Sequence, residues 1–242
     1  MKEEPALAGF VLAGGSALSL LLHHRLSEDL DFLFPAVRLP TQRLDALRLK
    51  AKEAGIVFRS ADDEAAVQEF AEGGLELHDY QQDFLVNEVV KVSFFAPDDQ
   101  LRKVLLAKAE TKARIATLPE LFKAKSLVSA KRSKTRDWLD LFLLMRDHGF
   151  TIQDYRAVFD EVGSSSECDI GLSRLCSGIP QRDDEGYAHL LPNPPSLEEM
   201  KTFFQAQRAR LEIDVAAEAK RRSDDSQVRP GSQVKKTPPS RN

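Results

Sequence analysis

The stretch Gly14-Gly15-Ser16, followed after twelve residues by Asp29-Leu30-Asp31, decides the fold expected of this 242-residue chain. Residues 10–13 before it are apolar and suit one short strand, and residues 17–22 form a strongly apolar helical segment. The second strand has a buried face opposite its acids, made by Leu30, Phe32 and Phe34. This order predicts a strand, a tight turn, a helix and a second strand with two alternating acids.

The acids and glycines of this stretch suit phosphate chemistry. Alternate residues of a strand point to one side, so Asp29 and Asp31 place two carboxylates on one face. Mg²⁺ is commonly bound by one or two carboxylates together with substrate phosphates. Gly14, Gly15 and Ser16 at a helix start let backbone N–H groups approach a phosphate. The alternatives, a chance acidic pair in a chain with 38 acids and an ordinary turn, stay open at this point.

The rest of the N-terminal half is predicted to form a mixed sheet with flanking helices. A helix is expected over residues 39–54, with Pro40 near its start and Gly55 just past its end. Strands are expected from residue 56, in a hairpin of residues 66–70 and 75–77 around Gly73-Gly74, and over residues 89–95. The fold class is therefore α+β or α/β.

From residue 119 onward the chain is predicted to be mostly helical. Helices are expected over residues 119–130, 135–148, 152–162, 168–177 and 196–222. Ser196 and Glu199 form a capping box at the start of the last helix. We divide the chain into an α/β core (1–118), a helical region that completes the site (119–222) and a polar tail expected to be disordered (223–242).

Charge is unevenly distributed, although the net charge is only −4. Residues 101–136 carry 11 basic and 2 acidic side chains, which favours either a polyanion-binding cleft or an ordinary solvated helix face. The acidic total argues against a dedicated duplex DNA binder. No run of about 18 apolar residues exists, so no membrane span is expected. The acidic N-terminus and the two widely spaced cysteines indicate a cytoplasmic protein with free thiols and no zinc site.

Helical periodicity singles out Lys125 among the basic residues. At about 100° per residue, Leu121, Ala124 and Val128 define the apolar arc of its helix, and Lys125 falls inside that arc. An unpaired buried charge is costly. A lysine in this position therefore either contacts a partner or ligand, such as a nucleotide phosphate, or extends its amine to solvent.

Asp137 and Asp140 lie three residues apart on an otherwise apolar helix and are neighbours on its surface. Acids in a first helical turn complement the helix dipole, with Thr135 as N-cap, and this explains Asp137 better than Asp140. His23 and His24 are expected to stabilise the end of the first helix rather than to act as ligands or bases.

Three regions of the chain together resemble one known family. They are residues 12–18 with 24–32, the strand over residues 90–95, and residues 125–141, which end in Arg136-Asp137-Trp138-Leu139-Asp140-Leu141. These regions resemble the AbiEii/AbiGii-type nucleotidyltransferases of the polymerase-β-like nucleotidyltransferase superfamily. The resemblance implies a polymerase-β-like core with a mixed sheet, followed by a C-terminal helical region. Many of these bacterial proteins are toxins of toxin–antitoxin or abortive-infection systems.

The resemblance also implies a reaction and the residues that perform it. The reaction is transfer of NMP from an NTP to an acceptor, either tRNA or another RNA or a protein side chain, with Mg²⁺ or Mn²⁺ as cofactor and a cognate antitoxin as partner. Asp29 and Asp31 are the implied metal ligands. The implied catalytic set is Asp29, Asp31, Lys125, Asp137 and Asp140. The implied nucleotide-binding set is Gly14, Gly15, Ser16, Ser27, Lys125 and Arg132.

Ser93 departs from the superfamily pattern, because many members have a third carboxylate on this strand. Serine is a poor metal ligand. This favours, as an alternative function, a catalytically degenerate nucleotide- or RNA-binding protein of the same fold. The candidates for a substitute carboxylate are Glu88, Asp98 and Asp99.

Overall fold

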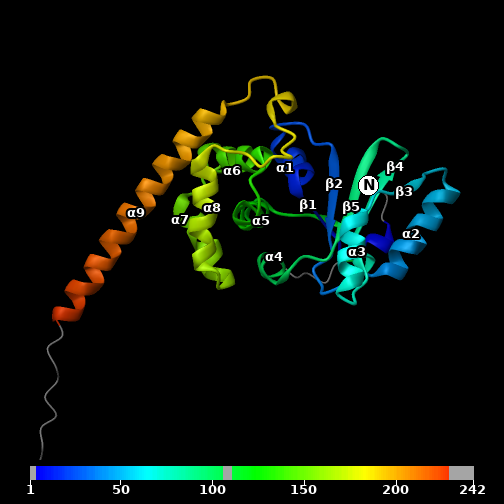
Figure 1. The fold of residues 1–242 in the computed structure, drawn as a ribbon, viewed down its shortest axis with the longest axis horizontal. Coiled ribbons are helices and arrows are strands. Elements are labelled where there is room, and N and C mark those ends of the chain that lie inside the picture. Colours follow the sequence, from blue (N-terminus) through cyan, green and yellow to red (C-terminus); the bar gives the residue numbers. More distant parts are fainter. Residues whose placement is uncertain (1–3, 106–110, 229–242) are drawn as a thin grey trace, which may run out of the picture.

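The computed structural model describes residues 4–105 and 111–228. In these residues six strands form one mixed sheet in the order β3-β4-β5-β2-β1-β6 (Figure 1). The pairs β2–β5 and β1–β6 are parallel and the other neighbouring pairs are antiparallel. The expected α+β class with a mixed sheet is confirmed. The strands are β1 (Val11–Ala13), β2 (Asp29–Leu33), β3 (Phe58–Ser60), β4 (Gln81–Val86), β5 (Val90–Phe95) and β6 (Arg114–Ile115).

Helices flank the sheet, with α2 and α3 near β3 to β5 and α5 to α8 in a layer beyond β1 and α1 (Figure 1). The last helix, α9, packs on α6, α7 and α8 and then extends away from the body. The helices are α1 (Gly14–Leu22), α2 (Thr41–Glu53), α3 (Glu64–Glu72), α4 (Asp99–Val104), α5 (Leu118–Lys131), α6 (Thr135–Asp147), α7 (Ile152–Val162), α8 (Ser165–Ser177) and α9 (Leu197–Val228). Short 3-10 helices are η1 (Pro5–Leu7), η2 (Leu77–Asp79) and η3 (Ala188–Leu190).

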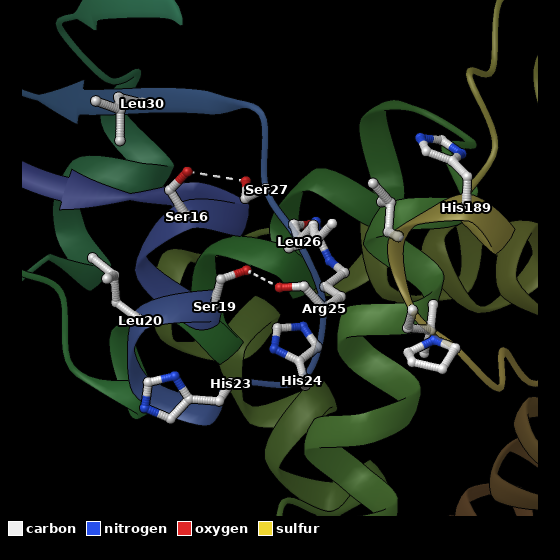
Figure 2. Close-up of a pocket in the computed structure, with 13 residues that line it drawn as sticks. Ser16, Ser19, Leu20, His23, His24, Arg25, Leu26, Ser27, Leu30 and His189 are labelled. Atoms are coloured by element: carbon white, nitrogen blue, oxygen red, sulfur yellow. Dashed lines mark hydrogen bonds between the residues drawn. The ribbon is translucent and has the colours of Figure 1, made fainter.

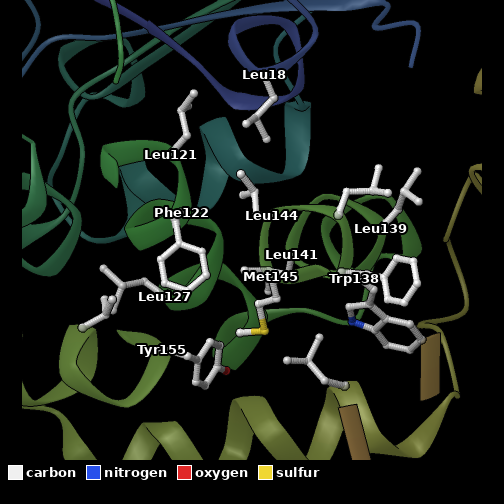
Figure 3. Packing of buried hydrophobic residues seen from close by; sticks show 14 of the residues in the cluster. Leu18, Leu121, Phe122, Leu127, Trp138, Leu139, Leu141, Leu144, Met145 and Tyr155 are labelled. Atoms are coloured by element: carbon white, nitrogen blue, oxygen red, sulfur yellow. The ribbon is translucent and has the colours of Figure 1, made fainter. Parts of the chain in front are cut away.

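Helix α6 is buried on nearly every side, as its apolar sequence predicts. Trp138, Leu139, Leu141 and Leu144 are all at most 1% exposed. They belong to one continuous hydrophobic cluster that also includes Leu18 of α1 and apolar residues of α5 (Figure 3). Burying such a side chain contributes about 1.5–3 kcal/mol. The cluster fixes α1, which begins at the glycines, against α5 and α6, which carry Lys125 and the two later acids.

The prediction of a hairpin around Gly73-Gly74 is wrong. Its first strand is instead helix α3, capped by Asp63, which accepts a hydrogen bond from the Ala65 N–H at 2.9 Å. Gly73 is the C-cap of this helix. The segment is rich in Ala, Glu and Gln, which favour helices, and Asp63 and Gly73 provide its start and stop signals. These local preferences outweigh the short apolar pattern.

Strand β4 was not predicted by the sequence pattern. It forms an antiparallel hairpin with β5 through a tight turn in which Asn87 and Glu88 have φ values of 48° and 58°. Residues 87–89 connect the paired Val86 and Val90, and the Val89 N–H donates to the Val86 carbonyl at 3.0 Å. Positive φ at both central residues is the conformation of a type I′ turn, and asparagine tolerates it well. The polar start of the strand, Gln81-Gln82-Asp83, hides it from a search for apolar alternation.

The predicted C-terminal helices are confirmed with small changes at their ends. The N-cap of α6 is Lys134 rather than Thr135, whose hydroxyl donates to Asp184 at 2.6 Å. The capping box of Ser196 and Glu199 is present, with hydrogen bonds of 2.7 and 3.1 Å. Helix α9 continues to Val228, so the tail predicted from residue 223 begins inside it, and residues 229–242 lie outside the described residues. No helix in the described part of the chain is long and apolar enough to cross a membrane.

Gly171→Ala should destabilise the protein, although alanine normally favours a helix over glycine by about 0.8–1 kcal/mol. A Cβ at Gly171 of α8 would overlap the hydroxyl of Tyr155 and lie 2.9 Å from Ser129 Oγ. Tyr155 is fully buried and bonded to Ser129 at 2.7 Å, so it has no room to move aside. We expect a loss of about 1–3 kcal/mol in urea unfolding. Ser173→Ala on the exposed side of α8 is the control, and equal stability of the two variants would contradict this packing.

Candidate active site

Asp29 and Asp31 lie on the same face of β2, as predicted, and their negative charges interact. Within the described residues, neither carboxylate has a hydrogen-bond or ion-pair partner. Burial, and then the charge of Asp29, raise the pKa of the Asp31 carboxyl. Two close carboxylates without a cation between them are unfavourable in a partly buried position. The pair is therefore suited to receive a cation.

The start of α1 is built against Asp31. Strand β1 ends at Ala13, which pairs with Asp31, and α1 begins at the next residue. Gly14 has a φ of 66°, and a Cβ there would overlap the Asp31 carboxylate. A Cβ at Gly15 would overlap the guanidinium of Arg25. No side chain caps the first turn of α1, so its first N–H groups have no side-chain acceptor at the N-cap.

Two serines connect α1 to the segment that precedes β2. The hydroxyl of Ser16 donates to the backbone carbonyl of Asp29 and lies 2.9 Å from the Ser27 hydroxyl (Figure 2). Ser19 donates to the carbonyl of Arg25 at 2.8 Å (Figure 2). These hydrogen bonds hold the acids of β2 at a fixed position relative to the start of the helix.

A cluster of buried charges lies behind the acids of β2. Lys125 Nζ contacts Asp137 Oδ1 at 2.6 Å and Asp140 Oδ2 at 2.8 Å. Arg25 donates to both oxygens of Asp140, at 2.8 and 3.0 Å. Arg132 Nε donates to Asp137 Oδ2 at 2.8 Å. We call these five residues the charge cluster. Its three cations exceed its two acids by one positive charge.

The charge cluster keeps its members ionised despite their burial. Burial would raise the pKa of Asp137 and Asp140, but Lys125 and the other basic neighbours outweigh it, and both pKa values lie below the ordinary range. Burial would likewise lower the pKa of Lys125, but the two carboxylates raise it. His24 adds a contact of 3.0 Å from Nε2 to Asp140 Oδ1, so it stabilises this cluster rather than the end of α1 alone.

The four predicted acids are thus of two kinds. Asp137 and Asp140 are each 1% exposed and have both oxygens bonded to cations. Asp29 and Asp31 are bonded to no cation within the described residues. Paired buried carboxylates position their partners, whereas an unpaired acidic pair is free to bind a ligand.

Two cavities divide the predicted residues between them. A cavity of about 320 Å³ includes Gly14, Asp31, Lys125, Arg132 and Asp137 in its lining. A larger one, of about 830 Å³, is lined by both Ser16 and Ser27, beside His23, His24 and Arg25 (Figure 2). Asp29, Gly15 and Asp140 are in the lining of neither. The smaller cavity contains the unpaired carboxylate of Asp31 and three cations, Lys91, Lys125 and Arg132, so it is the better place for phosphate chemistry.

None of the three substitute carboxylates suggested by the sequence lines the smaller cavity. Glu88 lies in the β4–β5 turn and pairs with Arg59. Asp98 caps α4 and pairs with Lys131, and Asp99 pairs with Arg102 on the same helix. The carboxylate that does line it is Asp83 of β4, which lies opposite Ser93. Sequence reasoning missed it because it missed the strand.

The basic segment over residues 101–136 does not form an unpaired band in its described part. Several of its cations pair with acids of other segments: Lys123 with Glu161, Lys131 with Asp98, Lys134 with Glu185, and Arg136 with Glu28 and Glu185. Arg132 is different, because it lines the smaller cavity and its side chain is 48% exposed.

Asp140→Ala should be strongly destabilising. It removes the carboxylate shared by Lys125 and Arg25 and leaves two buried cations without it. Removing one member of a buried ion pair costs about 3–5 kcal/mol. Asp147→Ala on the same helix breaks only an exposed pair with Arg146 and should cost less than about 1 kcal/mol. Urea unfolding at neutral pH measures both, and similar losses would contradict the role of Asp140.

Acid should destabilise the wild type more than the Asp140→Asn variant. The pKa of Asp140 is lowered in the folded protein from a value of 3.8 when unperturbed. Its contribution to the unfolding free energy is therefore complete above that value and is lost as the pH falls below it. The stability difference between wild type and variant, followed by urea unfolding from pH 7 to pH 3, should shrink below about pH 4. A difference that stays constant or grows in acid would contradict this.

Comparison with known proteins agrees with the family resemblance. Residues 2–229 match the family model described as nucleotidyl transferase AbiEii toxin, type IV TA system. No curated protein matches the chain. Two solved structures are similar. One is a putative nucleotidyltransferase from H. pylori, with 19% identity, coverage of 86% of this chain and 90% of that one, and a TM-score of 0.44. The other is MenT4, a nucleotidyltransferase toxin from Mycobacterium tuberculosis H37Rv, with 15% identity, coverage of 81% and 74%, and a TM-score of 0.49.

The match to the family model is the finding that decides identity, because it extends over nearly the whole chain. It includes the glycine turn, the acids of β2 and every residue of the charge cluster. The chain belongs to the AbiEii family of nucleotidyltransferase toxins.

Proposed function

We propose that this toxin nucleotidyltransferase transfers NMP from an NTP to an acceptor hydroxyl with the help of Mg²⁺ or Mn²⁺. One observation supports this most directly: the unpaired acids of β2 lie between the start of α1 and the cations of the charge cluster. The two acids can bind a divalent cation, and the start of α1 and the cations of the charge cluster can bind phosphates. The smaller cavity thus combines the groups that nucleotidyl transfer requires.

Asp29 and Asp31 fit a divalent cation. They are hard oxygen donors, close enough that one raises the pKa of the other. No group of three or more acidic, histidine or cysteine side chains suited to a metal occurs in the described residues. Mg²⁺ needs no such group, since it is held by one or two carboxylates and completes its shell with substrate phosphates and water. When bound, the cation would neutralise phosphate charge and orient the triphosphate.

The triphosphate has three sets of donors in the smaller cavity or beside it. The uncapped N–H groups at Gly14 to Ser16 favour an anion, as helix starts do in general. Lys125 has three N–H donors, and its two contacts with Asp137 and Asp140 leave one for a phosphate. Within the described residues the terminal nitrogens of Arg132 have no hydrogen-bond partner, and this arginine opens to solvent.

These residues would act on the leaving pyrophosphate. The acceptor oxygen attacks the α-phosphorus in line, the bond to the β-phosphate breaks, and negative charge develops on pyrophosphate. Lys125 and Arg132 are already charged and fixed by Asp137 and Asp140, so they stabilise that charge without reorganising. The role of Asp137 and Asp140 in this proposal is to position the cations rather than to contact the substrate.

We propose RNA, with the 3′ end of tRNA as the first acceptor to test, and a cognate antitoxin as the protein partner. The family description, a type IV toxin–antitoxin system, supports the antitoxin. The half-exposed Arg132 at the cavity supports an acceptor that is itself a polyanion. A second function, nucleotide binding without catalysis, is favoured by Ser93, which places no carboxylate opposite Asp31 on β5.

Asp29→Asn combined with Asp31→Asn should abolish transfer while the protein stays folded. The substitutions remove both charges at nearly constant volume, and we expect a rate at least about 100-fold lower. Because the lost charges repel each other, the thermal midpoint should be unchanged or higher. The assay incubates the protein with each α-labelled NTP, Mg²⁺ and total bacterial RNA. Asp45→Asn on α2, outside both cavities, is the matched control.

The outcomes separate the two functions. Label in RNA with wild type and Asp45→Asn but not with the double variant supports the proposal and identifies the nucleotide. Transfer by the double variant at the wild-type rate overturns the site. Cation-dependent NTP binding by the wild type without transfer to RNA or protein favours the binding protein instead.

A further inference from the structure

A row of three side chains crosses the sheet at the smaller cavity. Asp31 of β2 pairs with Ser93 of β5, and Ser93 pairs with Asp83 of β4. These strands are neighbours in the sheet (Figure 1). Directly paired residues of neighbouring strands project from the same face. All three residues line the smaller cavity, so a serine lies between two carboxylates on its floor.

Asp83 is buried and only half satisfied. The residue is 8% exposed, and its Oδ2 accepts a hydrogen bond from Gln81 Nε2 at 2.9 Å. Its Oδ1 is buried and has no hydrogen-bond partner within the described residues. A buried polar atom without a partner costs about 1–3 kcal/mol, and more when it is charged. Because Asp83 lines the smaller cavity, a ligand bound there would complete the bonding of this carboxylate.

The small side chain of Ser93 leaves room for that ligand. Neighbouring strands lie about 4.8 Å apart, so the Cα atoms of Asp31 and Asp83 are roughly 10 Å apart, with Ser93 midway. A group about 4 Å above the Ser93 Cα is then roughly 6 Å from each of the other two Cα atoms, which is about the length of an aspartate side chain plus one hydrogen bond. A carboxylate at Ser93 itself would fill this space. The serine that removes the usual carboxylate therefore also opens a position between Asp31 and Asp83.

The position suits the acceptor rather than the cation. Asp29 and Asp31 form the acidic pair at the start of α1, and Asp83 joins no three-residue ligand group in the described residues. Of the cations that line the smaller cavity, Lys125 and Arg132 belong to α5 and its C-cap, and Lys91 lies on β5 opposite Asp29 rather than beside Asp83. On the β4 side, Oδ1 of Asp83 is the buried acceptor atom that remains without a donor.

We propose that Asp83 binds the attacking hydroxyl of the acceptor and removes its proton, replacing the carboxylate that Ser93 lacks. This inference rests on the proposed nucleotidyl transfer. The acceptor O–H donates to Asp83 Oδ1. As the oxygen forms its bond to the α-phosphorus, the proton passes to Asp83, and the bond to the β-phosphate breaks with its electron pair leaving on pyrophosphate. Asp83 then returns the proton to solvent.

The backbone keeps Asp83 in place for this role. Its N–H donates to Asp62 Oδ1 at 2.7 Å. The other oxygen of Asp62 accepts from Ser60 at 2.7 Å and contacts His78 at 3.0 Å. Asp62 lines neither cavity of the candidate site. Asp62 thus positions the strand at Asp83 without access to a substrate.

The test compares Asp83→Asn with Asp45→Asn and wild type in single-turnover transfer from the labelled NTP to its acceptor, together with equilibrium binding of the NTP in Mg²⁺. Asparagine has the size of aspartate but does not accept the proton. Asp83→Asn should lower the transfer rate about 100-fold or more. Its NTP affinity and thermal midpoint should stay close to those of the wild type. Asp45→Asn is the same substitution on α2, outside both cavities, and should transfer at nearly the wild-type rate.

Each result decides the proposal. A slow Asp83→Asn that binds NTP normally, beside an active Asp45→Asn, supports it. Transfer by Asp83→Asn at the wild-type rate overturns it while leaving nucleotidyl transfer intact. Equal losses of NTP affinity and rate, or equal losses in the two variants, also overturn it, because Asp83 would then bind the nucleotide or matter no more than a residue outside both cavities. A wild type that transfers no label from any NTP overturns the proposed function and this role with it.

Discussion

The contact of Lys125 with Asp137 and Asp140 is the interaction on which the site depends. A charged ammonium group in the interior is stable only if nearby carboxylates offset the free energy that it loses with its hydration. Here two carboxylates at 2.6 and 2.8 Å do so. Each of them also holds an arginine, Arg132 on one side and Arg25 on the other. The same contact therefore fixes a cation in the cavity and connects α5, α6 and the segment before β2.

The acids of the site fall into two groups, those that are paired with cations and position them and those that are unpaired and available to a ligand. Asp137 and Asp140 are neutralised inside the protein, whereas Asp29, Asp31 and Oδ1 of Asp83 have no cation or donor within the described residues. The acids without partners border the smaller cavity or lie beside it on the same strand. A fold can bear a few unsatisfied groups where a ligand completes them, and such groups cluster at functional sites.

The sequence predicted the parts of this site that are encoded locally. Strand alternation placed Asp29 and Asp31 on one face, and helical periodicity placed Lys125 inward, both as observed. The partners of Asp140 could not be found in this way, since Arg25 lies 115 positions from it. Asp83 was missed for a related reason. Its strand is defined by pairing with β5 and by an Asn87-Glu88 turn, not by its own apolar pattern.

The separation between Arg25 and Asp140 has a consequence for biosynthesis. Contacts between distant positions form only after the later segment exists, and a chain emerges from the ribosome N-terminal end first. A nascent chain that stops before α6 contains the glycine turn and both acids of β2 but has neither acid that holds Lys125. In such a chain Lys125 and Arg25 would lack the fixed positions that they have in the complete protein. The site of this toxin can therefore assemble only after translation has passed the middle of the chain.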